Sequence, residues 1–313
     1  MVLVTSGGYY NSSNSVRLSS VSVWRPGQPR CSLPSLPVPR SHHTMDSVGG
    51  VLTVCGGQDR DDSEETASAC LQLEGGVWRK VCSTQQRRSY HCSWLSARGL
   101  VLLGGVLSPN TTEVVLPSSL GSRLPGPGFP LAHDSMESCA IAVGGGLVLT
   151  GGGYPDPASS HVTLYTEAGA VTELPTLGTG RREHACGSLV MAGEEVRPGL
   201  LCIYLYCRVQ VYIVAGGYGG GQVLASTELY QGGEWREGNP LPSPRNGARA
   251  GVLEGKLFLT GGWGSGDSAM DEVLRFHPDT EAWVTEGKLD IRMNFHAVTA
   301  IPLRDIDTYC TEE

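Results

Sequence analysis

Short apolar runs that each end in a pair of glycines recur along the chain. The runs are Val2–Gly8, Val51–Gly57, Leu100–Gly105, Leu147–Gly152, Val209–Gly217 and Lys256–Gly262. With the first glycine of each pair at positions 7, 56, 104, 151, 216 and 261, the steps are 49, 48, 47, 65 and 45 residues. A period of about 40 to 50 residues built of strands is typical of a β-propeller. The pattern therefore predicts six blades.

The residues between two glycine pairs predict four strands per blade. Segments such as Ser226–Tyr230 and Asp271–Phe276 alternate apolar with polar positions, which suits a half-buried strand. A tryptophan follows in four repeats and has the size to fill the wedge between two twisted sheets (Trp24, Trp78, Trp235, Trp283). A proline-rich turn, an arginine and a further strand complete each repeat. The glycines give the backbone freedom in φ where a strand ends at the crowded centre.

These features together resemble the Kelch repeat family. The matching elements are the glycine pair after an apolar strand, the aromatic pairs Tyr230 with Trp235 and Phe276 with Trp283, and the arginine that opens the next repeat. The resemblance covers nearly the whole chain and is strongest over Val211–Pro302, whereas repeats three and four are degenerate. It implies an all-β, six-bladed propeller of four-stranded blades in one domain, residues 1–313. The structural glycines would be Gly7, Gly8, Gly56, Gly57, Gly104, Gly105, Gly151, Gly152, Gly216, Gly217, Gly261 and Gly262.

The two ends of the chain are expected to meet in the first blade. The chain begins on a glycine-pair strand and finishes on Phe295–Pro302, a segment of the kind that precedes such a strand. We therefore expect residues 296–301 to pair with Val2–Ser6 and close the ring. Closure of this kind removes an exposed sheet edge, which would otherwise invite aggregation.

The 65-residue step indicates inserted material at about residues 196–210. Deleting these 15 residues would shorten the step to 65 − 15 = 50 residues. Two explanations stay open: a retained short intron, or a hairpin extension in which Cys202 and Cys207 form a disulfide.

Cysteine content and glycosylation sequons favour an extracellular setting. The ten cysteines include no Cys-x-x-Cys pair, which argues against zinc and for disulfides; the candidate pairs are Cys55 with Cys70 and Cys82 with Cys92. Asn11 and Asn110 begin glycosylation sequons. Because Met1–Gly8 reads as a strand and not as a signal peptide, we expect a fragment of a longer secreted product. The alternative is a cytoplasmic protein whose cysteines are buried thiols.

Charge and hydropathy argue against a nucleic acid as partner and against a membrane-spanning helix. The formal net charge of −8 argues against a nucleic acid, whose phosphates bind basic surfaces. The most apolar stretch, Leu200–Ala215, is interrupted by Arg208 and Gln210 and is too short for a membrane-spanning helix.

The motifs predict no enzyme, no cofactor and no metal site. Histidines stand at the start of an equivalent inner strand in four blades, so repeat position explains them better than metal ligation does (His43, His91, His184, His296). The glycine-rich loops at Gly216 and Gly261 are not followed by a helix, which a phosphate cradle needs. Kelch-like copper oxidases need a Tyr, His and Cys constellation that no motif in this chain supplies.

Arginines before the inner strands are the candidate binding residues. They are Arg40, Arg88, Arg181, Arg182, Arg245 and Arg292. Kelch propellers of ubiquitin-ligase adaptors use comparable arginines to hold acidic peptides, so the resemblance implies a protein or peptide ligand of acidic character. The alternative is that each arginine hydrogen-bonds the turn of the neighbouring blade. The variants Arg88→Ala and Arg292→Ala would distinguish the two roles.

The function that follows is a non-catalytic, monomeric protein-interaction module that presents loops from a rigid propeller, secreted and disulfide-linked. The first alternative is the substrate-recognition propeller of an intracellular BTB-Kelch ubiquitin-ligase adaptor. A weaker alternative is a relative of the Kelch-like copper oxidases.

Overall fold

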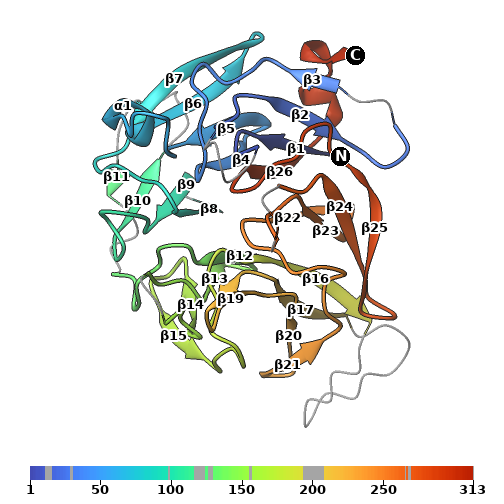
Figure 1. The fold of residues 1–313 in the computed structure, drawn as a ribbon. Coiled ribbons are helices and arrows are strands. Elements are labelled where there is room, and N and C mark those ends of the chain that lie inside the picture. Colours follow the sequence, from blue (N-terminus) through green and yellow to red (C-terminus); the bar gives the residue numbers. More distant parts are fainter. Residues whose placement is uncertain are drawn as a thin grey trace.

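Six β-sheets of four or five strands are arranged around a common axis, in the order of the chain (Figure 1). The structure is a computed structural model and describes residues 1–10, 16–28, 31–97, 99–115, 124–125, 130–154, 157–192, 208–264, 266 and 269–312. The prediction of an all-β, six-bladed propeller is confirmed. Among the described residues, no helix has the length and apolar character needed to cross a membrane.

Blades two to six each contain four antiparallel strands. Blade two holds β4 (Thr44–Val48), β5 (Val51–Cys55), β6 (Ala69–Glu74) and β7 (Val77–Ser83); blade three holds β8 (Cys92–Ser96), β9 (Gly99–Leu103), β10 (Thr112–Val115) and β11 (Leu124–Pro125). Blade four holds β12 (Cys139–Val143), β13 (Gly146–Thr150), β14 (Val162–Thr166) and β15 (Val171–Leu174); blade five holds β16 (Ala185–Ala192), β17 (Arg208–Ala215), β20 (Thr227–Gln231) and β21 (Glu234–Gly238). Blade six holds β22 (Arg249–Leu253), β23 (Lys256–Thr260), β24 (Glu272–His277) and β25 (Ala282–Lys288). Shorter elements are α1 (Glu64–Ser68), the pair β18 (Tyr218–Gly219) and β19 (Gln222–Val223), and 3-10 turns at Leu303–Asp305 and Asp307–Tyr309.

Blade one is closed by the end of the chain. Its strands lie in the order β26 (Ala297–Ile301), β1 (Val2–Ser6), β2 (Val21–Trp24), β3 (Cys31–Leu33) and β27 (Thr311–Glu312). The pairing of β1 with β26 runs from Val2 opposite Ile301 to Ser6 opposite Ala297, which confirms the predicted closure.

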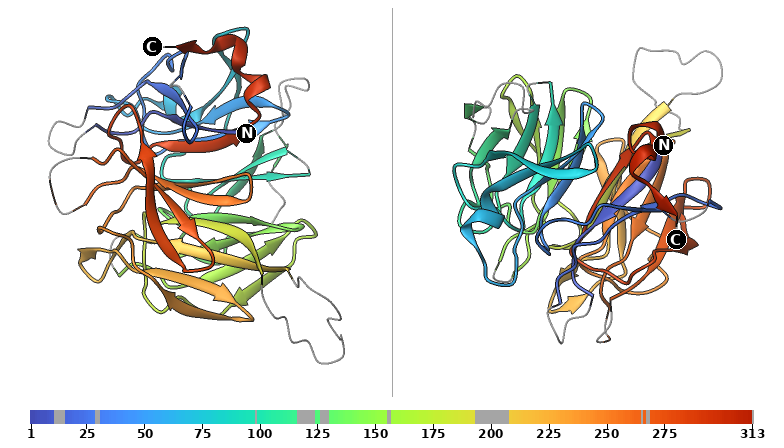
Figure 2. Two further views of the ribbon diagram at one scale, coloured as in Figure 1. Left: turned by 90° about the vertical axis from the view of Figure 1, so that its right-hand side faces the viewer. Right: turned by 90° about the horizontal axis from the view of Figure 1, so that it is seen from above.

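The last residues of the chain make a second connection to blade one, which was not predicted from the sequence. Beyond β26 the chain crosses the blade and pairs β27 with the outer strand β3, where a disulfide joins Cys31 to Cys310. Ile306 is buried in the apolar core that blades one and two share. Both views of Figure 2 show this C-terminal segment beside the N-terminal strands. Blade one is therefore held at its inner and its outer edge.

The tryptophans fill the space between adjacent blades, as predicted. The Trp78 indole Nε1 of blade two donates to the carbonyl oxygen of Pro34 at 2.7 Å, and that of Trp283 in blade six donates to Thr227 Oγ1 of blade five at 3.2 Å. The Trp24 ring of blade one meets Phe258 of blade six edge-on at 5.3 Å. Trp235 packs with the apolar cluster between blades four and five. Each large ring thus joins two sheets.

The glycine pairs are fixed by backbone geometry, and Gly7 shows why. Its φ is +59°, and a Cβ there would lie 2.6 Å from His43 Cε1 and still closer to the carbonyl oxygen of Arg40. The next residue, Gly8, donates its N–H to that carbonyl at 2.8 Å. A side chain at Gly7 would be strained in φ and would break this contact between blades.

The predicted insertion lies largely outside the described residues. Residues 193–207 are not described, but residues 208–210 belong to β17, where Gln210 lies opposite Val190 in β16. The bounds of the insertion, at about residues 196–210, stay a prediction. A single domain over residues 1–313, and the origin of the inserted residues, stay predictions.

Candidate functional site at the channel mouth

Four of the six candidate arginines lie inside the protein. Arg40, Arg88, Arg181 and Arg245 are at most 2% exposed. Each donates from Nη1 to the carbonyl oxygen of the first glycine in a pair: Gly56 at 2.9 Å, Gly104 at 2.8 Å, Gly216 at 2.9 Å and Gly261 at 3.3 Å. These hydrogen bonds are the ones expected if each arginine binds the turn of the neighbouring blade. Partner binding by these side chains stays a prediction, and their burial gives it no support.

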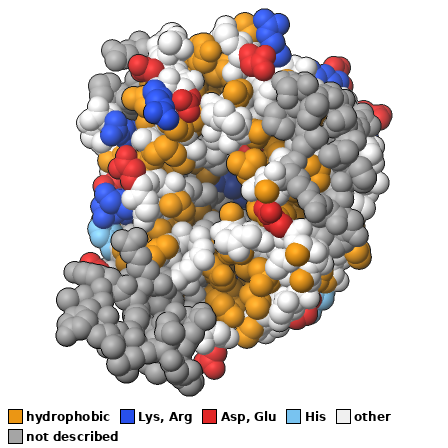
Figure 3. Space-filling view, turned by 180° about the vertical axis from the view of Figure 1, so that it is seen from behind, with side chains coloured by type: hydrophobic (Ala, Val, Ile, Leu, Met, Phe, Trp, Pro, Cys, Tyr) orange, Lys and Arg blue, Asp and Glu red, His pale blue; other side chains and the backbone are white. Residues whose placement is uncertain are grey.

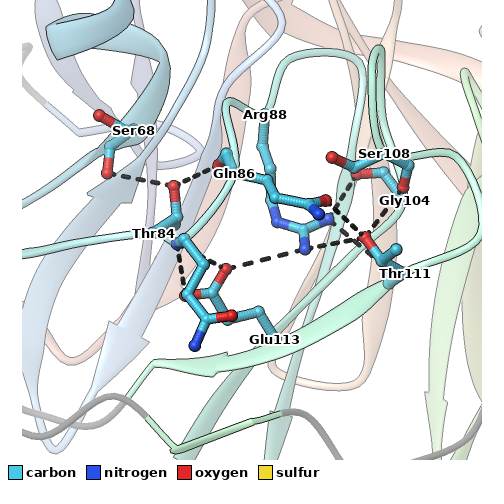
Figure 4. A network of polar contacts seen from close by, with 9 residues as sticks. Ser68, Thr84, Gln86, Arg88, Gly104, Ser108, Thr111 and Glu113 are labelled. Atoms are coloured by element: carbon cyan, nitrogen blue, oxygen red, sulfur yellow. Dashed lines mark hydrogen bonds and ion pairs between the residues drawn. The ribbon is translucent and has the colours of Figure 1, made fainter.

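At three of these four arginines, a glutamate near the start of the third strand of the blade lies beside the guanidinium. Arg181 Nη2 lies 2.6 Å from Glu228 Oε1, and Arg245 Nη2 lies 2.7 Å from Glu272 Oε2. Around Arg88 the same part of blade three supplies Thr111, at 3.1 Å from Nη2, and Glu113, at 3.8 Å (Figure 4). From the sequence, the segments with these Thr-Glu and Asp-Glu pairs were interpreted only as half-buried strands. Their recurrence after three glycine pairs was the signal that could have revealed them as partners of the arginines.

Arg292 does not belong to this set. Met293 takes the equivalent backbone position, since its carbonyl oxygen accepts from Gly262 N at 2.9 Å. Arg292 is exposed one residue earlier. The alignment of Arg292 with the other arginines is thus wrong by one residue, because the sixth repeat keeps the turn but not the arginine.

Six loop residues close a ring of backbone hydrogen bonds where the inner strands begin. Each N–H donates to the carbonyl oxygen of the equivalent residue in the preceding blade, and every φ in the ring lies between 48° and 62°. In order around the channel the donors and acceptors are His42 to Phe295 at 2.9 Å, Tyr90 to His42 at 3.1 Å, Glu137 to Tyr90 at 3.1 Å, Glu183 to Glu137 at 2.9 Å, Gly247 to Glu183 at 2.9 Å and Phe295 to Gly247 at 2.8 Å. We call these six residues the mouth ring.

One half of the mouth ring is aromatic. The imidazole of His42 stacks on Tyr90 with 3.6 Å between ring centroids and lies 4.4 Å from Phe295. Tyr9 meets the His42 ring edge-on at 5.6 Å. Tyr9, Tyr90 and Phe295 are each partly exposed. This half offers flat apolar surface of the kind found at binding hot spots.

The other half is acidic. The Glu137 carboxylate pairs with Arg182 at 2.7 Å, and Glu183 accepts from the Asn246 amide at 2.6 Å. Arg182 also lies over the rings of Tyr154 and Tyr218, with its guanidinium carbon 5.0 and 4.9 Å from their centroids. Arg182 forms the ion pair with Glu137, and the charge of Arg249 also acts on both carboxylates.

The pKa of both carboxyls is raised, mainly by burial. Burial raises the pKa of Glu137 to about 7, and the negative charge of Glu183 adds to the rise. Burial also raises the pKa of Glu183, although Asn246 and Arg182 oppose it. Near neutral pH this half of the mouth ring takes up a proton, because burial and the neighbouring negative charge disfavour the ionised carboxyl of Glu137.

The histidines that follow the mouth ring are structural neighbours of the glycine pairs. Their Nε2 atoms contact hydroxyls of the blades: His43 with Ser6 at 2.9 Å, His91 with Thr44 at 3.2 Å, His184 with Thr150 at 2.8 Å and His296 with Thr260 at 2.8 Å. Burial, aided by nearby arginines, lowers the pKa of each, to about 3 for His91 and His296. The four imidazoles are therefore neutral at physiological pH.

Three other potential ligands gather on blade four, away from the mouth ring. The nearest nitrogen and oxygen atoms of His133, His161 and Glu173 lie within 4.8 Å of one another. The two imidazoles are stacked 3.7 Å apart with an angle of 11° between their planes. A metal ion lies in the plane of each imidazole that binds it, and two nearly parallel planes at this spacing do not meet there. The group does not hold a metal as it stands.

The cysteine predictions had mixed outcomes. Cys55 and Cys70 are joined as predicted, and a third disulfide links Cys139 to Cys186 between the inner strands of blades four and five. The pairing of Cys82 with Cys92 is wrong, because the buried Cys92 thiol instead donates to the Ser138 carbonyl oxygen at 3.0 Å. Cys202 and Cys207 lie outside the described residues, as does Asn11, whereas Asn110 is exposed.

Comparison with known proteins agrees with this architecture. Residues 244–289 match the model of the Kelch motif. The chain is 27% identical over 249 residues to Kelch repeat and BTB domain-containing protein 12 of Danio rerio, a match that covers 68% of this chain and 36% of the relative. It is 22% identical over 312 residues to Kelch-like protein 23 of Mus musculus, covering 94% of this chain and 50% of the relative. The chain thus spans about half or less of the length of these relatives.

A solved structure entitled "Structure of YjhT" shares the fold, with a TM-score of 0.68 over 90% of this chain and 97% of the other, at 13% identity. At that identity the likeness concerns the fold alone. The chain thus contains a Kelch motif, is similar to Kelch-repeat proteins and folds as a six-bladed propeller.

Proposed function

We propose that the chain is a non-catalytic protein-binding module whose mouth ring holds a segment of a partner protein. The observation that carries this proposal is the pairing, on one rigid ring, of an aromatic half with a carboxylate half that takes up a proton near neutral pH. Loops held on a rigid scaffold are the usual location of binding residues. The relatives are Kelch-repeat proteins by name, which supports an interaction role.

The charge of the mouth ring favours a basic residue in the partner. A Lys or Arg side chain placed between Glu137 and Glu183 would interact favourably with both carboxylates. An adjoining apolar or aromatic side chain would cover the rings of Tyr90 and Phe295. An acidic ligand, expected from the sequence, would meet these two carboxylates instead of the buried arginines.

Selection from a phage-displayed random peptide library on the immobilised chain tests the ligand class. We expect sequences enriched in Lys or Arg next to an aromatic residue. Glu183→Gln should weaken binding of the selected peptides at least tenfold, because it removes one carboxylate of the pair, while the surface variant Glu254→Gln should leave binding unchanged. Enrichment of Asp and Glu, or equal binding by Glu183→Gln, would refute the basic ligand.

The pH dependence of peptide binding follows from the raised pKa of Glu137. Below about pH 7 this carboxyl is protonated in the unbound protein and must release its proton when a cation binds. Affinity is therefore expected to fall as pH decreases, by up to tenfold for each pH unit below about 7. Glu137→Gln should flatten the profile in a fluorescence-polarisation titration. An affinity that rises on acidification would contradict the assignment.

We further propose an extracellular location. Its support is the three disulfides among the described cysteines, since disulfides persist in oxidising compartments. The competing proposal is the propeller of an intracellular BTB-Kelch adaptor, favoured by the names of the relatives.

Mass spectrometry of the native protein with and without reduction distinguishes these locations. An extracellular protein should give the linked peptides of Cys31 with Cys310, Cys55 with Cys70 and Cys139 with Cys186, and a glycan on Asn110 or Asn11. Reduced thiols at all these positions with both asparagines bare would instead support the adaptor.

A further inference from the structure

Three cysteines lie side by side across blade two. In the register of the sheet, Cys55 of β5 is opposite Cys70 of β6, and Cys70 is in turn opposite Cys82 of β7. Residues directly opposite one another in antiparallel strands project from the same face of the sheet. That face packs on blade three, because Cys55 and Cys70 are buried in one apolar cluster with Leu100 and Leu102 of β9, and Cys82 packs against this cluster.

The exposure of the three side chains differs along this row. Cys55 and Cys70 are joined by a disulfide and are each 0% exposed. Cys82 lies on the outer strand of the blade, is half-buried, and carries a thiol. Opposed residues of antiparallel strands have Cα atoms about 4.5 to 5.5 Å apart, within the roughly 4.4 to 6.8 Å that a disulfide spans. A bond between Cys82 and Cys70 is therefore compatible with the register of the sheet.

The order of the three sulfur atoms suits thiol–disulfide exchange. In this reaction a thiolate attacks one sulfur of a disulfide, and the other sulfur leaves as a thiolate. The attacking sulfur approaches from the side opposite to the leaving sulfur. Cys82 and Cys55 lie on the two sides of Cys70 in the sheet. Cys70 is thus the sulfur that Cys82 can attack, and Cys55 is the sulfur that leaves.

We propose that Cys55, Cys70 and Cys82 form a thiol–disulfide exchange site, in which Cys82 is the entry point for small thiols and small disulfides. In the step within the protein, Cys82 loses its proton and its thiolate attacks Sγ of Cys70. The bond between Cys82 and Cys70 forms, the bond between Cys70 and Cys55 breaks, and the Cys55 thiolate takes up a proton. One disulfide replaces another, so this step needs no oxidant or reductant.

The disulfide moved to Cys82 can react with a small thiol from solvent. The small thiol attacks Sγ of Cys82, so that it becomes bound to Cys82 and Cys70 is released as a thiol. A second thiol then displaces the first from Cys82 as a small disulfide. In sum, the protein disulfide is reduced to two thiols, and two small thiols are oxidised. The reverse sequence lets a small disulfide form the bond between Cys55 and Cys70, although neither residue is exposed.

The other two disulfides of the described cysteines do not need such a route. In the bond of Cys31 with Cys310, Cys310 is partly exposed. The bond of Cys139 with Cys186 lines a section of the central channel with a volume of about 160 Å³. Seen from behind, the centre of the molecule is hollowed (Figure 3). A small thiol can attack these two bonds directly, so they serve as internal references.

Reduction of the native chain by dithiothreitol tests the proposal. Samples are quenched with acid over time, their thiols are alkylated, and the disulfide-linked peptides are quantified by mass spectrometry. The bond between Cys55 and Cys70 should be lost at least about tenfold faster in the parent chain than in Cys82→Ser, because a serine hydroxyl does not attack a disulfide. Loss of the two reference disulfides should be equal in the two chains.

Three further variants control for folding and for the path of the exchange. Cys92→Ser removes a buried thiol of blade three and should leave the reduction rate of the blade-two disulfide unchanged. Cys82→Ala repeats the test if the serine lowers the temperature of thermal unfolding. Cys55→Ser leaves Cys70 and Cys82, which should be recovered as one linked peptide after treatment with oxidised glutathione. Equal reduction rates with and without the Cys82 thiol, or the absence of that linked peptide, would overturn the proposal.

Discussion

Replacing Arg181 by methionine is expected to lower the free energy of unfolding by about 3 to 5 kcal/mol, the cost of removing one partner from a buried ion pair. The guanidinium donates to the carbonyl oxygens of Gly216 and Ser226 and pairs with Glu228 at 2.6 Å. Without it, the buried Glu228 carboxylate loses its counter-ion and keeps only the backbone N–H bonds from Gly178 and Thr179. Thermal and urea unfolding would measure the loss.

Two further variants separate this structural role from partner binding. Arg292→Met changes an exposed arginine and should alter stability by less than about 0.5 kcal/mol. The double variant Arg181→Met with Glu228→Leu should regain part of the lost stability, because no unpaired carboxylate stays buried. If Arg181→Met kept its stability and lost only the partner, the arginine would belong to the binding site after all.

Deleting residues 294–313 is expected to abolish the folded monomer. The deletion removes β26, the pairing partner of β1, and two links of the hydrogen bonding around the mouth. The strand Val2–Ser6, buried at all five positions, would become a sheet edge open to other chains. Size-exclusion chromatography with light scattering should show oligomers, and the cooperative unfolding transition should be lost.

The variant Cys310→Ser is the matched control for this deletion. It keeps β26 and breaks only the bond to Cys31, so the chain should stay monomeric and lose about 2 to 4 kcal/mol, as is typical when a disulfide is removed. A monomeric deletion variant with the stability of Cys310→Ser would show that β26 is dispensable and that the disulfide carries the closure.

The number of blades and the closure of the ring could be predicted because they depend on residues that recur along the chain. The glycine pairs mark where strands end, and the tryptophans mark where blades pack, so blade number and ring closure followed from local pattern. The tail beyond β26 could not be predicted, because Cys310 pairs with a residue 279 positions away and nothing local signals that contact.

The candidate site was harder to predict, because the sequence does not show whether an arginine side chain is buried or exposed to solvent. Arg40, Arg88, Arg181 and Arg245 are charged and recurrent, which suggested binding, yet the same recurrence suits a bond made once in each blade. The mouth ring could not be predicted because its residues do not recur as one residue type. Residues as different as His42, Glu183 and Gly247 share a backbone role that side-chain patterns do not reveal.

In the mouth ring, backbone groups hold the blades together, whereas the side chains are left to determine which ligand binds. Its six links use only backbone N–H and C=O groups, so the ring demands a left-handed backbone at each position and leaves the side chain open. Gly247, where a Cβ would lie 2.9 Å from the Phe295 ring, shows that one position can stay empty to make room for its neighbour. Substitutions at the partly exposed positions, such as Tyr90 and Phe295, could therefore change the specificity of this face, or of a designed propeller built on it, while the backbone links stay the same.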